Sequence, residues 1–307
     1  MRTTSLVLSL FLAACATRKP AADALPLVVD QQLRTAVVAS LKELGPKVGA
    51  AVWLSRPMQP AAWEYNSDAD MPVASAIKAA YLVELFAEFP GDLDAPLPDA
   101  AEVLDNEKHP AIAHFKPEQR TIADQALRSA SVRRLGEAMI TGKGIDNATY
   151  NIAANLVTAH FGGPEWLQVR LLARDPSWQG LKVRRYMLAD RTANGDNTAT
   201  AAALAAVHGM LANSAVPGVD ARAITAAREV LKRPDDAVGR HVFAKDGALD
   251  SWPVTRVEAG WHETANGPIV HVVMLQQSQG SGSASDAGAR LGKAAKSIEQ
   301  LLLNGVR

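Results

Sequence analysis

The stretch Met71-Pro72-Val73-Ala74-Ser75-Ala76-Ile77-Lys78-Ala79-Ala80-Tyr81 decides how the rest of this chain is interpreted. Ser75 and Lys78 form a Ser-x-x-Lys pair, and on a helix this spacing places both side chains on one face. A serine in the first turn also lies in the positive end of the helix field. Burial lowers the pKa of a lysine, so a desolvated Lys78 could take the hydroxyl proton of Ser75.

Ser-x-x-Lys also occurs by chance on solvated helix faces, so the surrounding residues decide between the two interpretations. Apolar side chains follow at helical spacing and indicate a largely buried helix: Ile77, Tyr81, Leu82 and Leu85. A lysine in such a helix needs a reason to be there, and this favours a catalytic pair.

Two other segments carry groups suited to the same chemistry. Thr149 and Asn151 could project a hydroxyl and a carboxamide from one loop into a cleft, although a helix N-cap followed by a helix fits this segment as well. In Val242–Ala248, Lys245 supplies positive charge and Gly247 permits close backbone approach. The N–H of Ala248 could point at a developing oxyanion, but alone this segment is a strand edge with a turn.

Hydrophobic periodicity predicts a helix, two strands, a long helical insert, two strands and a helix. The first helix covers residues 30–44, and the helical insert extends from about 75 to 230. Asn266-Gly267 is a strong hairpin signal because both residues tolerate positive φ. The remaining predicted elements are strands at 47–54, 61–65, 254–263 and 268–276, and a last helix with the stripe Leu291, Ala295, Ile298 and Leu302. The terminal parts would share an antiparallel sheet, and the insert would form an all-helical lobe, with a cleft between them.

In this order and spacing, the three segments resemble the penicilloyl-serine transferase superfamily, and above all the class A β-lactamases, whose triplet is Ser-x-x-Lys, Ser-Asp-Asn and Lys-Thr-Gly. The resemblance continues through Tyr150–Leu156, Gly162-Gly163-Pro164 and Asp196–Thr200, and covers nearly all of residues 28–307. It implies an α/β (α+β) fold of the β-lactamase/transpeptidase type, with a five-stranded antiparallel sheet flanked by terminal helices. The implied α/β lobe is 28–74 with 228–307, and the all-helical lobe is 75–227.

The resemblance also implies a role for each matching residue. Ser75 would be the nucleophile, Lys78 its proton acceptor, and Thr149 the hydroxyl that passes a proton to the leaving nitrogen. Asn151 would position the substrate, and Lys245 would orient charge near Thr149. The N–H groups of Ser75 and Ala248 would form an oxyanion hole beside Gly247, and Arg256 would offset negative charge on the substrate.

Three positions depart from the family pattern. Thr149 stands where a serine is expected; it keeps the hydroxyl and adds a methyl group. Asp246 replaces the Thr or Ser that usually hydrogen-bonds a β-lactam carboxylate, and a carboxylate there would repel that group unless Lys245 or Arg256 compensates. The Glu-x-x-Leu-Asn segment has no counterpart, because no Glu occurs between residues 180 and 196.

Asp190 is the sequence's candidate for the missing deacylating acid, since it precedes Asn194 by four residues. It could activate the hydrolytic water, but its shorter side chain moves the oxygens back by about one C–C bond, and catalysis is sensitive to displacements of ~1 Å. The alternative is that Asp190 pairs with a neighbouring arginine, Arg184, Arg185 or Arg191, in a surface network.

The N-terminus resembles a bacterial lipoprotein signal. An apolar run, Leu6–Leu12, is too short to span a bilayer and ends in Leu12-Ala13-Ala14-Cys15. The resemblance implies that residues 1–14 are removed and that Cys15, the only cysteine, is lipidated. Residues 15–27 would tether a periplasmic protein, with Ala after the Cys favouring the outer membrane. The alternative is a plain secretory signal with an incidental Cys.

Composition excludes several classes of function. The 307 residues include 32 Lys plus Arg and 32 Asp plus Glu, and this balance gives no electrostatic case for a nucleic-acid partner. The seven histidines lack metal-motif spacing, although His262 and His271 alternate along strands and could meet across the hairpin. We therefore expect no cofactor, no metal and a monomer attached to the membrane only through its lipid.

The expected activity is serine hydrolysis through an acyl-enzyme on Ser75, with β-lactamase-type opening of a cyclic amide as the leading substrate class. One alternative is a cell-envelope D,D-peptidase or esterase that acts on peptidoglycan-like amides or esters with the same Ser and Lys. The other is a penicillin-binding-like module that acylates and stalls, or that performs no chemistry.

Overall fold

The computed structural model describes residues 26–280 and 282–306. The predicted signal peptide and Cys15 lie outside these residues. Among the helices in the described ranges, none is both long enough and apolar enough to cross a membrane.

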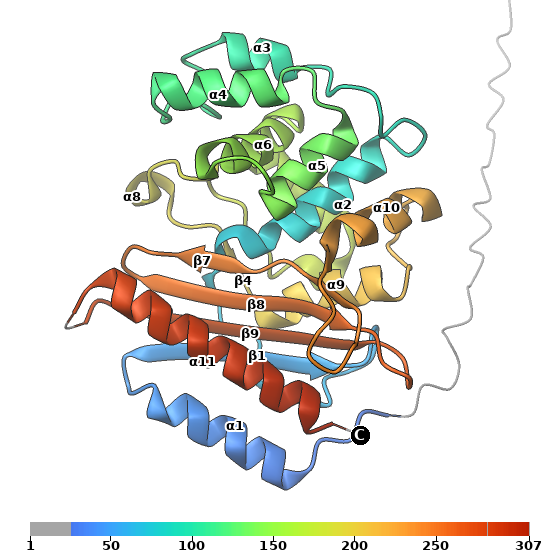
Figure 1. Ribbon diagram of the computed structural model, residues 1–307, viewed down its shortest axis with the longest axis vertical. Helices are drawn as coiled ribbons and strands as arrows, with labels where there is room; N and C mark the ends of the chain where they lie inside the picture. The colour runs from blue at the N-terminus through green and yellow to red at the C-terminus, as the bar shows by residue number, and fades with distance from the viewer. Residues whose placement is uncertain (1–25, 281, 307) are drawn as a thin grey trace, which may run out of the picture.

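An antiparallel sheet forms the centre of the molecule, with strands in the order β2-β1-β9-β8-β6-β5 and with β7 also paired to β8 (Figure 1). The strands are β1 (Val48–Ser55), β2 (Trp63–Tyr65), β5 (Lys232–Arg233), β6 (Val242–Ala244), β7 (Gly247–Leu249), β8 (Val254–His262) and β9 (Ile269–Gln277). The predicted hairpin at Asn266-Gly267 is β8–β9, and β9 pairs with β1 along its length. The predicted antiparallel sheet is confirmed.

The described residues contain seven strand segments in this sheet, where five strands were expected. Two of the segments, β6 and β7, belong to one interrupted edge strand, because Ala244 pairs with Gly260 and Gly247 with Val257 in a common register. The interruption is Lys245-Asp246, and the backbone N–H of Lys245 still donates to Ala259. The two-residue β5 beyond β6 is the further segment.

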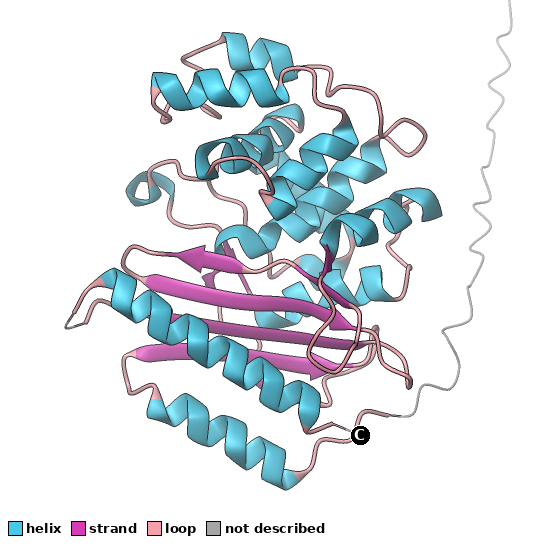
Figure 2. Ribbon diagram, in the orientation of Figure 1, coloured by secondary structure: helices cyan, strands magenta, loops and turns pink. Residues whose placement is uncertain are grey.

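Two hydrophobic layers cover the two faces of the sheet (Figure 2). On one face lie the terminal helices α1 (Gln31–Glu43) and α11 (Ala284–Asn304), and the predicted stripe of α11 is buried against strand residues such as Val254 and Leu275. The other face packs on the helical part of the chain through residues such as Trp261 and Val272. The sheet thus has apolar side chains on both faces, because it is covered on both.

The helical part lies above the sheet in Figure 1. Its helices are α2 (Lys78–Glu88), α3 (Ala100–Asp105), α4 (Pro117–Leu127), α5 (Val132–Thr141), α6 (Asn147–His160), α7 (Pro164–Arg174), α8 (Arg191–Asn194), α9 (Ala201–Ala212) and α10 (Ala221–Leu231). Short 3-10 turns, η1 (Ala74–Ile77) and η2 (Pro176–Trp178), and the two-residue pair β3 (Met71–Pro72) with β4 (Thr198–Ala199) complete it. Every residue of α2 from Lys78 to Phe86 is buried, which confirms that this helix runs through the core.

Candidate active site

Ser75 lies in the 3-10 turn η1, directly before α2. The β3–β4 pair and a hydrogen bond from the Val73 N–H to the Asn197 carbonyl (3.0 Å) hold the chain entering this turn. Ala74 has a φ of +50°, a left-handed conformation that is unfavourable for a residue with a side chain. The strained residue therefore directly precedes Ser75, which is half-buried and lines a pocket.

Lys78 is fully buried at the first position of α2. Its Nζ donates to Asn151 Oδ1 at 3.0 Å and lies 3.3 Å from the centroid of the Tyr150 ring. Burial, and secondarily the charge of Lys245, lower the pKa of Lys78 well below its ordinary value of 10.5. The neutral amine, which can accept a proton, is therefore favoured at a lower pH than in a solvated lysine.

The Tyr150 ring lies close to both lysines of the site, and the sequence analysis assigned it no role. The Lys245 Nζ lies 5.5 Å from the centroid of the same ring. An aromatic face attracts an ammonium group, so the Tyr150 ring is a favourable neighbour for Lys245 and, whenever it carries a proton, for Lys78. The only sequence signal for Tyr150 is its place between Thr149 and Asn151, because periodicity does not show which face of a helix borders a cleft.

Thr149 lies outside the pocket, contrary to its predicted position. The segment is helical from Asn147 onward, since Asp146 caps α6 by accepting from the Thr149 N–H at 2.8 Å. The Thr149 hydroxyl is buried and donates to the other oxygen of Asp146 at 3.1 Å. Helical spacing instead places Asn147, Tyr150 and Asn151 along the pocket.

The strand β7 packs directly on η1. A Cβ built on Gly247 would lie 2.4 Å from the Val73 carbonyl oxygen and 3.0 Å from the Ala76 nitrogen, so only glycine permits this approach. Ser75 and Ala248, the predicted oxyanion-hole residues, both line the pocket. The backbone of β7 is thereby brought against the turn that carries the serine.

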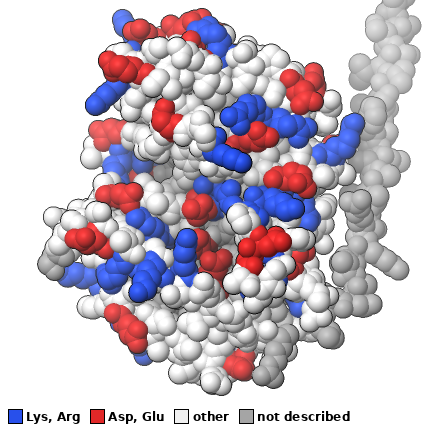
Figure 3. All heavy atoms as spheres, in the orientation of Figure 1, with Lys and Arg blue, Asp and Glu red and all other residues white. Residues whose placement is uncertain are grey.

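The pocket has a volume of about 490 Å³. Its lining combines predicted site residues with residues that the sequence analysis did not select: Ala74, Ser75, Asn147, Tyr150, Asn151, Arg185, Met187, Leu188, Asp196, Asn197, Lys245, Asp246, Ala248, Leu249, Asp250 and Ser251. Figure 3 shows Lys and Arg together with Asp and Glu on the face that contains the hollow between the helical part and the sheet. The lining is therefore mixed in charge.

Asp190 also lies outside this lining. It is exposed, caps the short helix α8, and accepts from the N–H and the hydroxyl of Thr192, each at 2.8 Å. These two hydrogen bonds lower the pKa of Asp190, so its carboxylate is ionised but directed at Thr192. Among the aspartates that line the pocket, Asp196 is the nearest to Asp190 in sequence. Its carboxylate accepts from Arg185 at 2.8 Å and from Arg191.

Arg256, which was predicted to offset negative charge on the substrate, likewise does not line the pocket. Its guanidinium donates to Asp250 at 2.5 Å and to the Leu249 carbonyl at 3.1 Å, on the side of the sheet where α11 packs. Asp246 is in the pocket and has its own cations: the Lys245 Nζ lies 3.4 Å from its carboxylate and Arg233 lies 3.9 Å from it. Burial raises the pKa of Asp246, but the charges of Lys245 and Arg233 and the hydrogen bonds to the carboxylate together outweigh it and leave the pKa lowered.

Several solved structures, class A β-lactamases among them, share this fold. A variant of the reconstructed class A β-lactamase of the last common ancestor of Gram-negative bacteria matches with a TM-score of 0.65 and 21% identity, over 89% of this chain and 98% of that one. A variant of the TLA-1 extended-spectrum β-lactamase matches at 0.64 and 13%, over 88% and 98%. A PBP-A mutant in an acyl-enzyme complex with penicillin G matches at 0.59 and 18%, over 88% and 97%.

At these identities the structural matches establish the fold, and they confirm the predicted β-lactamase-like architecture. A comparison with curated protein sequences returned no match. A family model described as "Beta-lactamase enzyme family" matches residues 32–299, from the first terminal helix to the last. By this match, which spans most of the chain, the chain belongs to the β-lactamase enzyme family.

Proposed function

We propose that this protein is a serine hydrolase that forms an acyl-enzyme on Ser75, with the amine of Lys78 as the proton acceptor. The observation that carries the proposal is the buried Lys78, whose lowered pKa favours a free amine close in sequence to a pocket-lining hydroxyl. The Asn151 oxygen orients this amine by accepting from it. An oriented base beside a hydroxyl is the arrangement that activates a serine nucleophile.

The proposed reaction is opening of a cyclic amide of the β-lactam type. The Ser75 oxygen bonds to the carbonyl carbon and its proton passes to Lys78; the C–N bond then breaks and the nitrogen takes a proton. The N–H groups of Ser75 and Ala248 would stabilise the oxyanion, because β7 is held against η1. Water releases the acyl group in a second step and restores the serine.

A second candidate, an acyl-enzyme that forms but is released slowly, is favoured by the position of the acids. Asp190 is bound to Thr192 outside the pocket, and Asp196 is held by two arginines. A carboxylate engaged in this way is a weak base for water, so the second step lacks the acid that the family pattern would supply. Acylation and deacylation are therefore expected to differ in rate.

Intact-protein mass spectrometry over time after addition of a penicillin tests both candidates. We expect a mass increase equal to one penicillin, which decays as water releases it. Persistence of the adduct, with a single stoichiometric burst from a chromogenic cephalosporin, would assign the stalled acyl-enzyme. The Ser75→Ala variant is the control, and an equal adduct on that variant, or none on the wild type, would contradict the proposal.

Asp246 is expected to disfavour substrates that carry a carboxylate. Its lowered pKa keeps it anionic at neutral pH, so Asp246→Thr should raise kcat/KM for carboxylate-bearing β-lactams several-fold to about tenfold by removing a like charge. Steady-state hydrolysis, or acylation rates if turnover stalls, measures this. An uncharged ester should react equally with both proteins, and an unchanged or lower kcat/KM for the β-lactam would contradict the repulsion argument.

We also propose that the protein acts in the periplasm as a lipoprotein anchored at Cys15. The support is the sequence Leu12-Ala13-Ala14-Cys15 after a short apolar run. Cells fed a labelled fatty acid should incorporate label into the wild type, and Cys15→Ser should abolish the label and release the protein into the soluble fraction. Labelling that persists in Cys15→Ser would show that the cysteine is not the anchor.

A further inference from the structure

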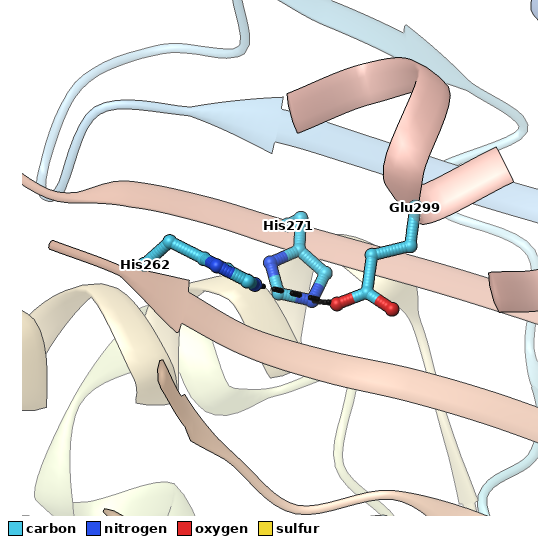
Figure 4. Close-up of side chains that lie close together, drawn as sticks. All are labelled: His262, His271 and Glu299. Carbon is cyan, nitrogen blue, oxygen red and sulfur yellow. Dashed lines mark hydrogen bonds and ion pairs between the residues drawn. The ribbon is translucent and has the colours of Figure 1, made fainter. Parts of the chain in front are cut away.

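A second polar cluster lies on the opposite face of the sheet from the pocket. His262 on β8 and His271 on β9 point toward the carboxylate of Glu299, which extends from α11 (Figure 4). Because Gly260 pairs with His271, the two histidines are diagonal neighbours on one face of the hairpin. Strand pairing and helix packing thus bring together three side chains that are 9 and 28 residues apart in sequence.

The geometry of the cluster fits one small cation. One potential ligand atom from each residue lies within 4.8 Å of the others. The Glu299 Oε1 lies 3.4 Å from the His262 Nε2 and 2.9 Å from the His271 Nε2. Ligands about 2.0–2.2 Å from a tetrahedral zinc ion are roughly 3.3–3.6 Å apart, so the Glu299–His262 separation already matches this spacing and the Glu299–His271 separation needs to lengthen by about half an ångström.

The buried state of the histidines gives an independent reason for a ligand. The side chains of His262, His271 and Glu299 are only 4%, 1% and 18% exposed. Among the described residues, neither ring nitrogen of His271 has a hydrogen-bond partner, because its 2.9 Å contact with Glu299 lacks hydrogen-bond alignment. A buried imidazole without a partner is costly, and a metal ion between it and the carboxylate would satisfy it.

Asp236 completes the arrangement from the loop before β6. Its Oδ2 lies 3.2 Å from the His262 Nδ1, on the side of the ring opposite Glu299. A carboxylate behind a histidine fixes the ring orientation and raises its basicity toward a metal.

We propose that His262, His271 and Glu299 bind one divalent transition-metal ion such as Zn²⁺, with Asp236 as the positioning residue for His262. Two imidazoles and one carboxylate are a donor set suited to zinc, and three protein ligands leave a fourth position open. The ion would connect α11 to the β8–β9 hairpin. Because an ion bound only by the folded chain stabilises it, this site would contribute to stability.

The test uses the full mature-length chain without a polyhistidine tag, refolded from denaturant with a slight excess of ZnCl₂ and then desalted. We expect about one zinc per chain by elemental mass spectrometry, and a higher Tm than for the same protein refolded with a chelator. Substituted Co²⁺ should show the visible absorption of a four-coordinate ion. Absence of bound zinc in the refolded wild type would overturn the proposal.

Matched variants separate this site from adventitious binding. Glu299→Gln keeps the shape of the side chain and should lose the zinc, and Asp236→Asn, which leaves all three ligands in place, should weaken zinc binding about 10–100-fold. His241→Gln is the control, because His241 forms an exposed pair with Asp235 at 2.8 Å. Equal zinc affinity in wild type, Glu299→Gln and Asp236→Asn, with each variant folded by near-UV circular dichroism, would reject the assignment.

Discussion

Lys78→Met is expected to slow acylation of Ser75 by a penicillin by about 10²–10⁴-fold, the range typical for loss of a positioned general base. Methionine preserves the volume of a side chain that is fully buried, so the loss would come from the missing amine rather than from a cavity. The measurement is the rate at which the penicillin adduct appears by intact mass. Lys143→Met, at an exposed position, is the control and should acylate like the wild type.

The same substitution should change how reactivity depends on pH. Acylation by the wild type should increase with pH as Lys78 loses its proton, and this should happen below its ordinary pKa of 10.5 because burial and Lys245 lower the pKa. In Lys78→Met the corresponding limb of the profile should disappear. A wild-type rate or an unchanged limb in this variant would mean that another group accepts the proton.

Stability gives a second readout of the Lys78 pKa. Between the lowered folded-state pKa and the unfolded value of 10.5, the unfolded chain binds more protons than the folded chain. The free energy of unfolding should therefore rise with pH through this window, and the rise should be smaller in Lys78→Met. Denaturant unfolding at a series of pH values measures both slopes, and equal slopes would argue against a lowered pKa.

Gly247→Ala is expected to have the second large effect, about 10²-fold or more on acylation. The added Cβ would meet the Val73 carbonyl at 2.4 Å, and backbone cannot move aside as a flexible side chain can. The separation of β7 from η1 would then move the Ala248 N–H away from the oxyanion, and displacements of ~1 Å are enough to impair catalysis. Overpacking should also cost about 1–3 kcal/mol of stability.

Gly91→Ala is the matched control for this prediction, because a Cβ at Gly91 meets no heavy atom within 4 Å among the described residues. Gly91→Ala should acylate at the wild-type rate and should unfold at the wild-type temperature. If Gly247→Ala acylates at the wild-type rate, close packing of β7 on η1 does not matter for the chemistry.

Strand alternation and helical periodicity in the sequence were sufficient to predict the main strands and helices. The strand pattern and the Asn266-Gly267 turn predicted the β8–β9 hairpin, and the stripe from Leu291 to Leu302 predicted α11. These patterns report which side chains are buried, and burial decides element type in long periodic segments. Short segments such as β5 and the interruption at Lys245-Asp246 carry too few residues to form a pattern.

Some residues of the site could be predicted from the sequence, and others could not. Motif spacing located Ser75, Lys78, Asn151 and Lys245, and the structure brings them to one region. It did not place Thr149 or Asp190, since the phase of α6 and the cap of α8 turn those side chains away from the pocket. Successive residues of a helix point in directions about 100° apart. A short motif does not specify which of its residues faces the pocket.

By itself, the sequence determined the order of the elements, the apolar faces and the Ser-x-x-Lys pair, because these depend on residues close along the chain. Only the tertiary structure decided that Tyr150 lies close to two lysines, that Asp196 rather than Asp190 borders the pocket, and that Glu299 meets His262 and His271. Those contacts join residues from separate elements, and their geometry is set by how the sheet and helices pack rather than by any local pattern.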